Sequence, residues 1–160
     1  MGYTTSFTGY FKIEPTPNQK IQNLINGLSK TRRMKRDVNI LKEHFPNTDF
    51  GIDGEFYFND DDFKNFGQDD TLGVIDYNNP PSTQPSLWLD WELDKEDPSK
   101  LKWNESEKFY SYIDWLDYLI KNIFTPNNLQ LNGTVKFYGE EPGDFGKISI
   151  RDNKIEVSYD

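Results

Sequence analysis

The feature that most constrains the fold is a proline-rich stretch in the middle of the chain. Residues 73–92 read GVIDYNNPPSTQPSLWLDWE and contain three prolines within six residues. Each proline fixes φ and removes a backbone N–H donor, so this part can form neither a helix nor the centre of a sheet. The stretch therefore predicts a stiff, extended connection that leads Trp88 and Trp91 into a following strand.

The length and composition of the chain bound its class. A chain of 160 residues can bury one core, so we predict a single domain over residues 1–160. Aromatic residues make up 16% of it and supply apolar area that aliphatic residues would otherwise provide. The sequence has no cysteine, a single histidine (His44), no P-loop and no Gly-x-Gly-x-x-Gly motif. Cysteine chemistry is thereby excluded, and we expect no cofactor and no metal ion.

The charge balance is acidic. The formal net charge is −9 and the sequence pI is about 4.6. Binding of nucleic acid as a bulk partner is not expected, because phosphate contacts need clustered cations. No apolar run reaches transmembrane length, so we expect a soluble cytoplasmic protein that does not bind membranes.

Strand patterns dominate the two ends of the chain. Residues 4–13 alternate apolar and polar side chains and predict a strand in which Gly9 marks a bulge. Residues 129–159 predict three more strands in a meander, with a tight turn at Asp152 and Asn153.

Helical periodicity marks two segments. The first has Thr16 as its predicted N-cap and apolar residues at i, i+3, i+4 and i+7, namely Ile21, Leu24, Ile25 and Leu28. The second is more apolar, with Asn104 as its predicted N-cap and an end before Pro126. Residues 37–50 are ambiguous, and a short helix stopped by Pro46 is one interpretation.

The remaining segments complete the predicted fold. We expect strands over residues 55–58 and 87–93, the latter in a hairpin with residues 101–103, and an exposed acidic loop over residues 59–70. Short links between neighbouring strands favour antiparallel pairing. The sequence thus predicts an α+β fold: a mostly antiparallel sheet in the order β-α-β-β-β-α-β-β-β, with two helices packed on one face.

A basic segment follows the first predicted helix. Arg32, Arg33 and Arg36 lie within five residues, with Lys30 and Lys35 beside them. Arginine forks grip phosphate or carboxylate in a bidentate way, so these arginines are candidate anion ligands. The alternative is that the cations complement the helix dipole or pair with nearby acids. We predict that folding brings the three guanidinium groups to the diproline segment.

The proline-rich stretch supplies further candidate ligand-binding residues. A stiff backbone lowers the ordering cost of binding, and amides and indoles give selectivity. On this reasoning Asp76, Asn78, Gln84 and Trp88 join the arginines as ligand-binding residues. Trp91 alternates with Leu89 and is expected in the core. The alternative is a connection whose tryptophans simply fill the core.

Carboxylates are abundant, and an acid–base pair can be proposed among them. Asp90 and Glu92 on the predicted strand, with Glu140, Glu141 and Asp144 in GEEPGD, are the least arbitrary choices. No catalytic residue is assigned, because no nucleophile signature accompanies them.

Several strings resemble a family of small proteins found in bacteria and some of their phages. They are TRRMKRD, DYNNPPSTQPSLW and EKFYSYIDWLDYLI, at residues 31–37, 76–88 and 107–120. The resemblance covers most of the chain, is most specific in NNPPSTQPSLW, and implies no activity. Residues 37–48 and the Asp-rich segment depart from the pattern.

Together these features predict a non-catalytic binding protein of bacterial or phage origin. We expect it to capture an anionic, phosphate-bearing small molecule or a protein partner, in an inhibitor, immunity-type or anti-defence role to which its acidic surface suits it. The alternative is a carboxylate-dependent hydrolase acting on a phosphorylated or sugar-containing substrate.

Overall fold

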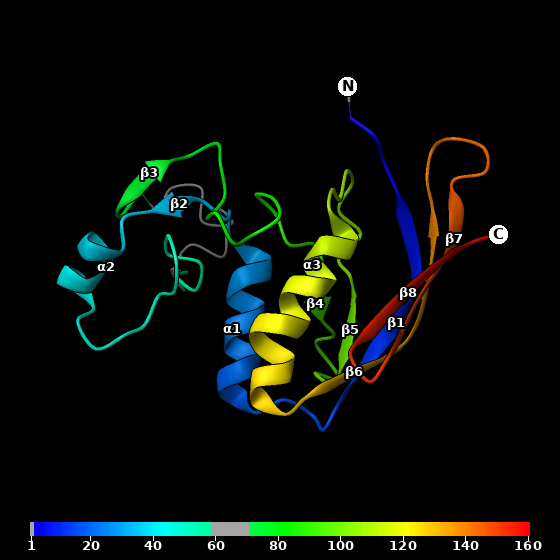
Figure 1. Ribbon diagram of the computed structural model, residues 1–160, viewed down its shortest axis with the longest axis horizontal. Helices are drawn as coiled ribbons and strands as arrows, with labels where there is room; N and C mark the ends of the chain where they lie inside the picture. Colours follow the sequence, from blue (N-terminus) through cyan, green and yellow to red (C-terminus); the bar gives the residue numbers. More distant parts are fainter. Residues whose placement is uncertain (1, 59–70) are drawn as a thin grey trace. The chain divides into compact units, whose positions relative to one another are not determined.

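The computed structural model describes residues 2–58 and 71–160 (Figure 1). The chain divides into two compact units, and each is described by itself. The first, the sheet unit, comprises residues 1–22 and 90–160; the second, the loop unit, comprises residues 23–89. This division does not test the prediction that residues 1–160 form a single domain, which stays a prediction. The predicted acidic loop over residues 59–70 lies outside the described residues.

The sheet unit is built on a six-stranded antiparallel sheet with the strand order β4-β5-β1-β6-β7-β8. Its strands are β1 (Ser6–Glu14), β4 (Trp91–Leu93), β5 (Lys100–Trp103), β6 (Gln130–Tyr138), β7 (Phe145–Arg151) and β8 (Lys154–Tyr159). The predicted hairpin is confirmed as the pair of β4 and β5, but its first strand covers only residues 91–93 and not the predicted 87–93, because residues 87–90 form no strand. The C-terminal meander is confirmed. The predicted turn at Asp152 and Asn153 is confirmed too, and both residues adopt positive φ, at 47° and 68°.

Alternation along β1 decides which face of the sheet is buried. Phe7 and Phe11 are buried, whereas Thr8 and Tyr10 are exposed, as the sequence predicts. The predicted bulge at Gly9 is wrong for the pairing with β6, whose register runs without a shift from Ser6 to Glu14. Gly9 instead permits close approach, since a Cβ there would come within 3.0 Å of the Thr134 carbonyl oxygen.

Aromatic rings fill the buried face of this sheet. The Phe7 ring lies 5.1 Å from that of Trp91 and 5.0 Å from that of Tyr112, centroid to centroid, in edge-to-face contacts. The Trp91 indole N–H donates to the Tyr112 carbonyl at 3.0 Å. Trp91 is fully buried, so its predicted place in the core is confirmed.

Helix α3 (Tyr112–Leu119) lies along this face of the sheet (Figure 1). It continues as a π-helical segment, Ile120–Phe124, and a 3-10 turn, Thr125–Asn127. The predicted N-cap at Asn104 is wrong: the N-cap is Ser111, seven residues later, and the helix begins at Tyr112. Asn104 is used differently, because its Oδ1 accepts from the Ser106 backbone N–H at 2.9 Å and closes a local turn.

Helix α1 (Gln19–Lys30) starts in the sheet unit and runs into the loop unit. Its apolar positions Ile21, Ile25 and Leu28 are buried, which confirms the predicted amphipathic helix. The predicted cap at Thr16 is wrong by two residues, since the Asn18 side chain accepts from the Ile21 N–H at 3.0 Å.

Over residues 23–58 and 71–89, the loop unit has little regular structure beyond α1. It contains β2 (Lys35–Arg36), α2 (Val38–His44) and β3 (Val74–Asp76), with β2 and β3 paired antiparallel. The short helix before Pro46 is confirmed, with Asp37 as its N-cap. The predicted strand over residues 55–58 is wrong: Glu55 and Phe56 lie in a turn, closed by a bond from the Tyr57 N–H to the Gly54 carbonyl at 3.0 Å, and Tyr57 and Phe58 follow without regular structure.

Among the described residues, helices and strands follow in the order β-α-β-α-β-β-β-α-β-β-β. The α+β class and the mostly antiparallel sheet are confirmed, and the part of the chain that the structure describes has one more helix and one more strand than predicted. Among the described residues, no helix combines the length and apolar character needed to span a bilayer.

Candidate functional site

The basic segment and the proline-rich stretch lie against each other within the loop unit. The Arg33 N–H donates to the Leu87 carbonyl at 2.8 Å, and the Lys35 N–H donates to the Asn79 carbonyl at 2.9 Å. The β2–β3 pair adds a contact between Lys35 and Asp76. Folding therefore brings the two segments together at the level of the backbone, but their side chains are disposed in different ways.

Arg33 is almost fully buried, with 2% of its surface exposed. Its Nη1 donates to the Glu55 carbonyl at 3.1 Å, and its Nη2 donates to the Tyr57 carbonyl at 2.8 Å and to the Thr31 hydroxyl at 2.5 Å. A buried guanidinium that donates to backbone carbonyls of the same chain has a structural role, because these bonds satisfy the Glu55 and Tyr57 carbonyls in an irregular segment.

Arg36 is also buried and makes contacts of the same kind. Its Nη1 donates to the Leu72 carbonyl at 2.8 Å. The guanidinium carbon lies 4.5 Å from the centroid of the Tyr57 ring, which places the cation over the aromatic face. Arg33 and Arg36 thus converge on the turn around Tyr57, and neither presents its guanidinium to solvent in this structure.

Arg32 differs from the other two arginines because its side chain is partly exposed. Its Nε donates to the Tyr77 carbonyl at 3.0 Å, and its guanidinium carbon lies 4.2 Å from the Tyr77 ring centroid and 6.0 Å from that of Trp88. Within residues 2–58 and 71–160, no hydrogen bond or ion pair engages its Nη1 and Nη2 groups. Their donors remain available to a ligand.

Gln84 is buried and, like Arg33, donates to a backbone carbonyl. Its Nε2 donates to the Glu55 carbonyl at 2.7 Å, the same oxygen that Arg33 binds. The Glu55 carboxylate accepts from the Thr83 hydroxyl at 3.0 Å and from the Ile52 N–H at 2.7 Å. The Glu55 turn therefore ties the basic segment to the proline-rich stretch.

Asp76 and Asn78 form a polar turn beside Tyr77. The Asp76 carboxylate accepts from the Asn79 side-chain amide at 2.6 Å and from the Asn78 N–H at 2.9 Å. These two bonds, the Asn79 bond first, hold the pKa of Asp76 below its ordinary value. Asp76 therefore shapes the loop that carries Tyr77, while the Asn78 side chain is exposed at the tip of that loop.

Sequence reasoning missed Tyr77 as a site residue. Its ring is 40% exposed and forms the platform on which the Arg32 guanidinium rests. The signal available in the sequence was its position between Asp76 and two asparagines, a turn that exposes its central side chains. Trp88, which the sequence pattern favours as a surface contact, is half-buried, and its ring centroid lies 6.0 Å from the Arg32 guanidinium carbon.

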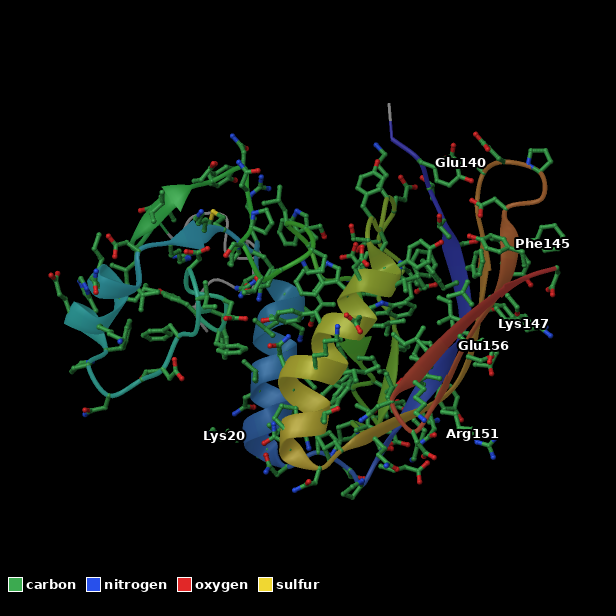
Figure 2. The ribbon with its side chains drawn as sticks, in the orientation of Figure 1. Lys20, Glu140, Phe145, Lys147, Arg151 and Glu156 are labelled. Atoms are coloured by element: carbon green, nitrogen blue, oxygen red, sulfur yellow. The ribbon has the colours of Figure 1, made fainter. Side chains whose placement is uncertain are left out.

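The carboxylates of the sheet unit do not form one cluster. The Glu140 carboxylate accepts from the Thr4 N–H at 2.6 Å, and the Tyr3 hydroxyl donates to the Asp144 carboxylate, so both acids hold the segment before β1. Figure 2 shows Glu140 at the β6–β7 turn. Among the described residues, no three carboxylate or imidazole groups lie close enough together to hold a metal ion.

Asp90 has the most perturbed carboxylate in the sheet unit. It is buried, and burial is the main cause that raises its pKa to about 6, with repulsion from Glu92 adding to the effect. The Asn104 side-chain amide donates to it at 3.2 Å and opposes that shift. Such a pKa suits a general acid, but a catalytic role also needs a second group and a substrate.

Comparisons of this chain with protein-family models, with curated proteins and with solved structures find no match. The resemblance to small bacterial and phage proteins therefore stays a prediction.

Proposed function

We propose that this chain is a non-catalytic binding protein that captures an anionic group on the loop unit. The group is carried by a phosphate-bearing ligand or by a protein partner. The observation that carries the proposal is the position of Arg32, which is stacked on Tyr77 with both Nη groups unoccupied by the described residues. The ligand-binding set is accordingly centred on Arg32, Tyr77 and Trp88, with Asn78 at its edge.

Preorganisation favours Arg32 over an ordinary surface cation. Its Nε is fixed by the Tyr77 carbonyl and one flat face is covered by the Tyr77 ring, so the outer edge of the fork points in a defined direction. A phosphate or carboxylate can accept two parallel N–H bonds from that edge. The side-chain entropy that an ordinary arginine loses on binding is already lost here.

The neighbouring charges modulate this site. Asp76 carries a negative charge on the same loop, but its oxygens accept hydrogen bonds from Asn78 and Asn79. Lys35 adds positive charge: its ammonium lies 3.9 Å from the Asp53 carboxylate, and its proximity contributes to the lowered pKa of Asp76. The site therefore suits one anionic group rather than a polyanion.

The proposal is tested by calorimetric titration of inorganic phosphate and of nucleoside monophosphates into the wild-type protein. We expect the Arg32→Ala variant to bind the best of these at least about tenfold more weakly, a loss of about 1.4 kcal/mol. Arg32→Lys is expected to fail as well, because lysine offers neither the planar fork nor the same stacking.

The matched control is Lys42→Ala, which removes one positive charge from an exposed position on α2 of the same unit. It should leave affinity unchanged. Equal binding by wild type and Arg32→Ala, or an equal loss in Lys42→Ala, would contradict the proposal.

The alternative function, a carboxylate-dependent hydrolase, is favoured by one observation, the burial of Asp90, which raises the pKa of its carboxyl group. It predicts turnover of a phosphorylated or glycosidic chromogenic substrate that falls at least a hundredfold in Asp90→Asn. Turnover that survives this substitution would remove Asp90 from the argument.

A further inference from the structure

The face of the six-stranded sheet opposite α3, here called the outer face, gathers basic side chains on an acidic chain. Its strand positions carry seven basic residues against three acidic ones (Glu14, Glu92 and Glu156): Lys12, Lys100, Lys102, Lys136, Lys147, Arg151 and Lys154. Figure 2 shows Phe145, Lys147 and Arg151 directed away from α3. Local charge on this face thus opposes the overall net charge of −9.

The strand register places these cations directly opposite one another. Lys136 pairs with Lys147 across β6 and β7, Arg151 pairs with Lys154 across β7 and β8, and Lys12 pairs with Lys100 across β1 and β5. Side chains in such pairs stand about 5 Å apart at Cβ, and like charges there destabilise a sheet. Three such pairs are unexpected in a chain with 27 acidic residues, and they suggest that the cations on this face bind a ligand.

Few of the described basic side chains on the outer face form an ion pair with an acidic side chain. Lys12 lies 3.9 Å from the Asp97 carboxylate, and Lys102 lies 3.3 Å from that of Asp94. Across the part of the chain that the structure describes, no ion pair engages the four exposed cations on β6, β7 and β8, which are Lys136, Lys147, Arg151 and Lys154. Their charges are therefore available to an external polyanion.

Exposed aromatic rings lie among these cations. Tyr10, Tyr138 and Phe145 are exposed by 46%, 45% and 39%, and Tyr138 and Phe145 are directly opposite in the β6–β7 pair. Lys100 lies over the Tyr10 ring at 4.6 Å. Open sheet faces that combine stacking rings with basic side chains bind single-stranded nucleic acid, with bases on the rings and phosphates on the cations.

We propose that the outer face of the six-stranded sheet binds single-stranded nucleic acid. The cross-strand pairs Lys136–Lys147 and Arg151–Lys154 contact phosphates, and Tyr138 and Phe145 stack on bases. Unlike the anion site of the loop unit, this surface is extended and carries several unneutralised cations, so it fits a polyanion. The two proposals concern different residues and stand or fall separately.

The test is fluorescence anisotropy of the full chain with a labelled oligothymidylate of about 10 nucleotides, a typical site size for sheet-based binders. We expect binding at low salt that weakens steeply as salt is added. Lys136→Glu with Lys147→Glu should weaken it at least about tenfold and reduce the salt slope by about 1.4, at about 0.7 per lost phosphate contact on single strands. Tyr138→Ala should weaken binding about tenfold with the salt slope unchanged.

The matched control is the pair Lys20→Glu and Lys121→Glu, which alters net charge equally at exposed positions outside the strands. It should retain most of the affinity, and circular dichroism confirms that each variant is folded. The proposal is overturned by absence of binding at low salt, by an equal loss in the control pair, or by tighter binding of duplex DNA, oligoglutamate or anionic vesicles than of the single strand.

Discussion

In the loop unit, buried arginines donate to backbone carbonyls of other residues, whereas on the outer face of the sheet cations stand opposite one another in exposed pairs. The difference follows from the backbone. In a sheet the ladder satisfies the carbonyls, so side chains need not. In the irregular loop unit, carbonyls such as those of Glu55, Tyr57 and Leu72 obtain donors from Arg33, Gln84 and Arg36. A basic residue can therefore either satisfy backbone carbonyls or stay exposed on the surface, and the regularity of the local backbone determines which of the two occurs.

The largest effect is expected from removing Arg33. Arg33→Met should lower the free energy of unfolding by about 3 kcal/mol or more, because two backbone carbonyls and the Thr31 hydroxyl lose a buried charged donor. Urea denaturation measures it. The matched control, Arg32→Met, should cost less than about 1 kcal/mol, since its guanidinium is partly exposed. Equal losses in the two variants would erase the distinction between them.

Asp90 offers the corresponding test of a buried charge in the sheet unit. Because burial raises its pKa to about 6, the folded state holds a proton that the unfolded state releases near pH 4. Stability should therefore fall as pH rises from about 4 to about 6, by up to about 3 kcal/mol, and then level off.

Asp90→Asn should abolish this fall, leaving the variant more stable than wild type at pH 7.5 and little changed at pH 4. Denaturant unfolding across that range measures it, with the exposed Glu107→Gln as control. A wild-type free energy of unfolding that rises between pH 4 and 6 would contradict the raised pKa of Asp90.

Packing in the loop unit can be tested at Gly27 on α1. Alanine normally stabilises a helix relative to glycine by about 1 kcal/mol. Here a Cβ would overlap the Phe58 ring, so Gly27→Ala should destabilise the protein by about 1–2 kcal/mol. In a Phe58→Ala background the same change should become neutral or stabilising. Thermal unfolding of the four proteins gives the coupling, and additive effects would argue against this contact.

The smallest effect concerns the exposed pairs of the outer face. Lys147→Glu turns the Lys136–Lys147 pair into opposite charges and should raise stability by about 0.5 kcal/mol at low salt, vanishing at high salt. Lys20 lies in α1 and has no cross-strand neighbour, so Lys20→Glu should not raise stability. A stabilising change that weakens single-strand binding would show that the pair is kept for a partner; a destabilising one would mean that the pair is not repulsive.

The regular part of the fold was readable from sequence and the irregular part was not. Alternation in β1 and the turn at Asp152 and Asn153 predict strands because these patterns are local. The start of α3 was missed because Glu105 and Lys108 adopt positive φ, which L-residues with long side chains rarely do. Strands as short as β2 and β3 carry no periodicity at all.

The candidate site was predicted in outline only. The sequence analysis predicted that the basic segment and the proline-rich stretch lie close together, because both stand out in composition. The burial of Arg33 could not be predicted, because its partners Glu55 and Tyr57 lie 22 and 24 residues away in a turn that reads as a strand. The role of Tyr77 depends on the same tertiary contacts. Ligand roles for Arg33, Arg36, Asp76 and Gln84 stay predictions, and the bonds they make are internal.

The central claim is that neighbouring arginines have different roles, and hydrogen exchange of arginine side-chain protons, followed by NMR on the unmodified protein, tests it most directly. The guanidinium protons of Arg33 and Arg36 should exchange far more slowly than the Nη protons of Arg32, because the former are buried and bonded to carbonyls. Rapid exchange at all three arginines would contradict the account, as would protection of Arg32 alone.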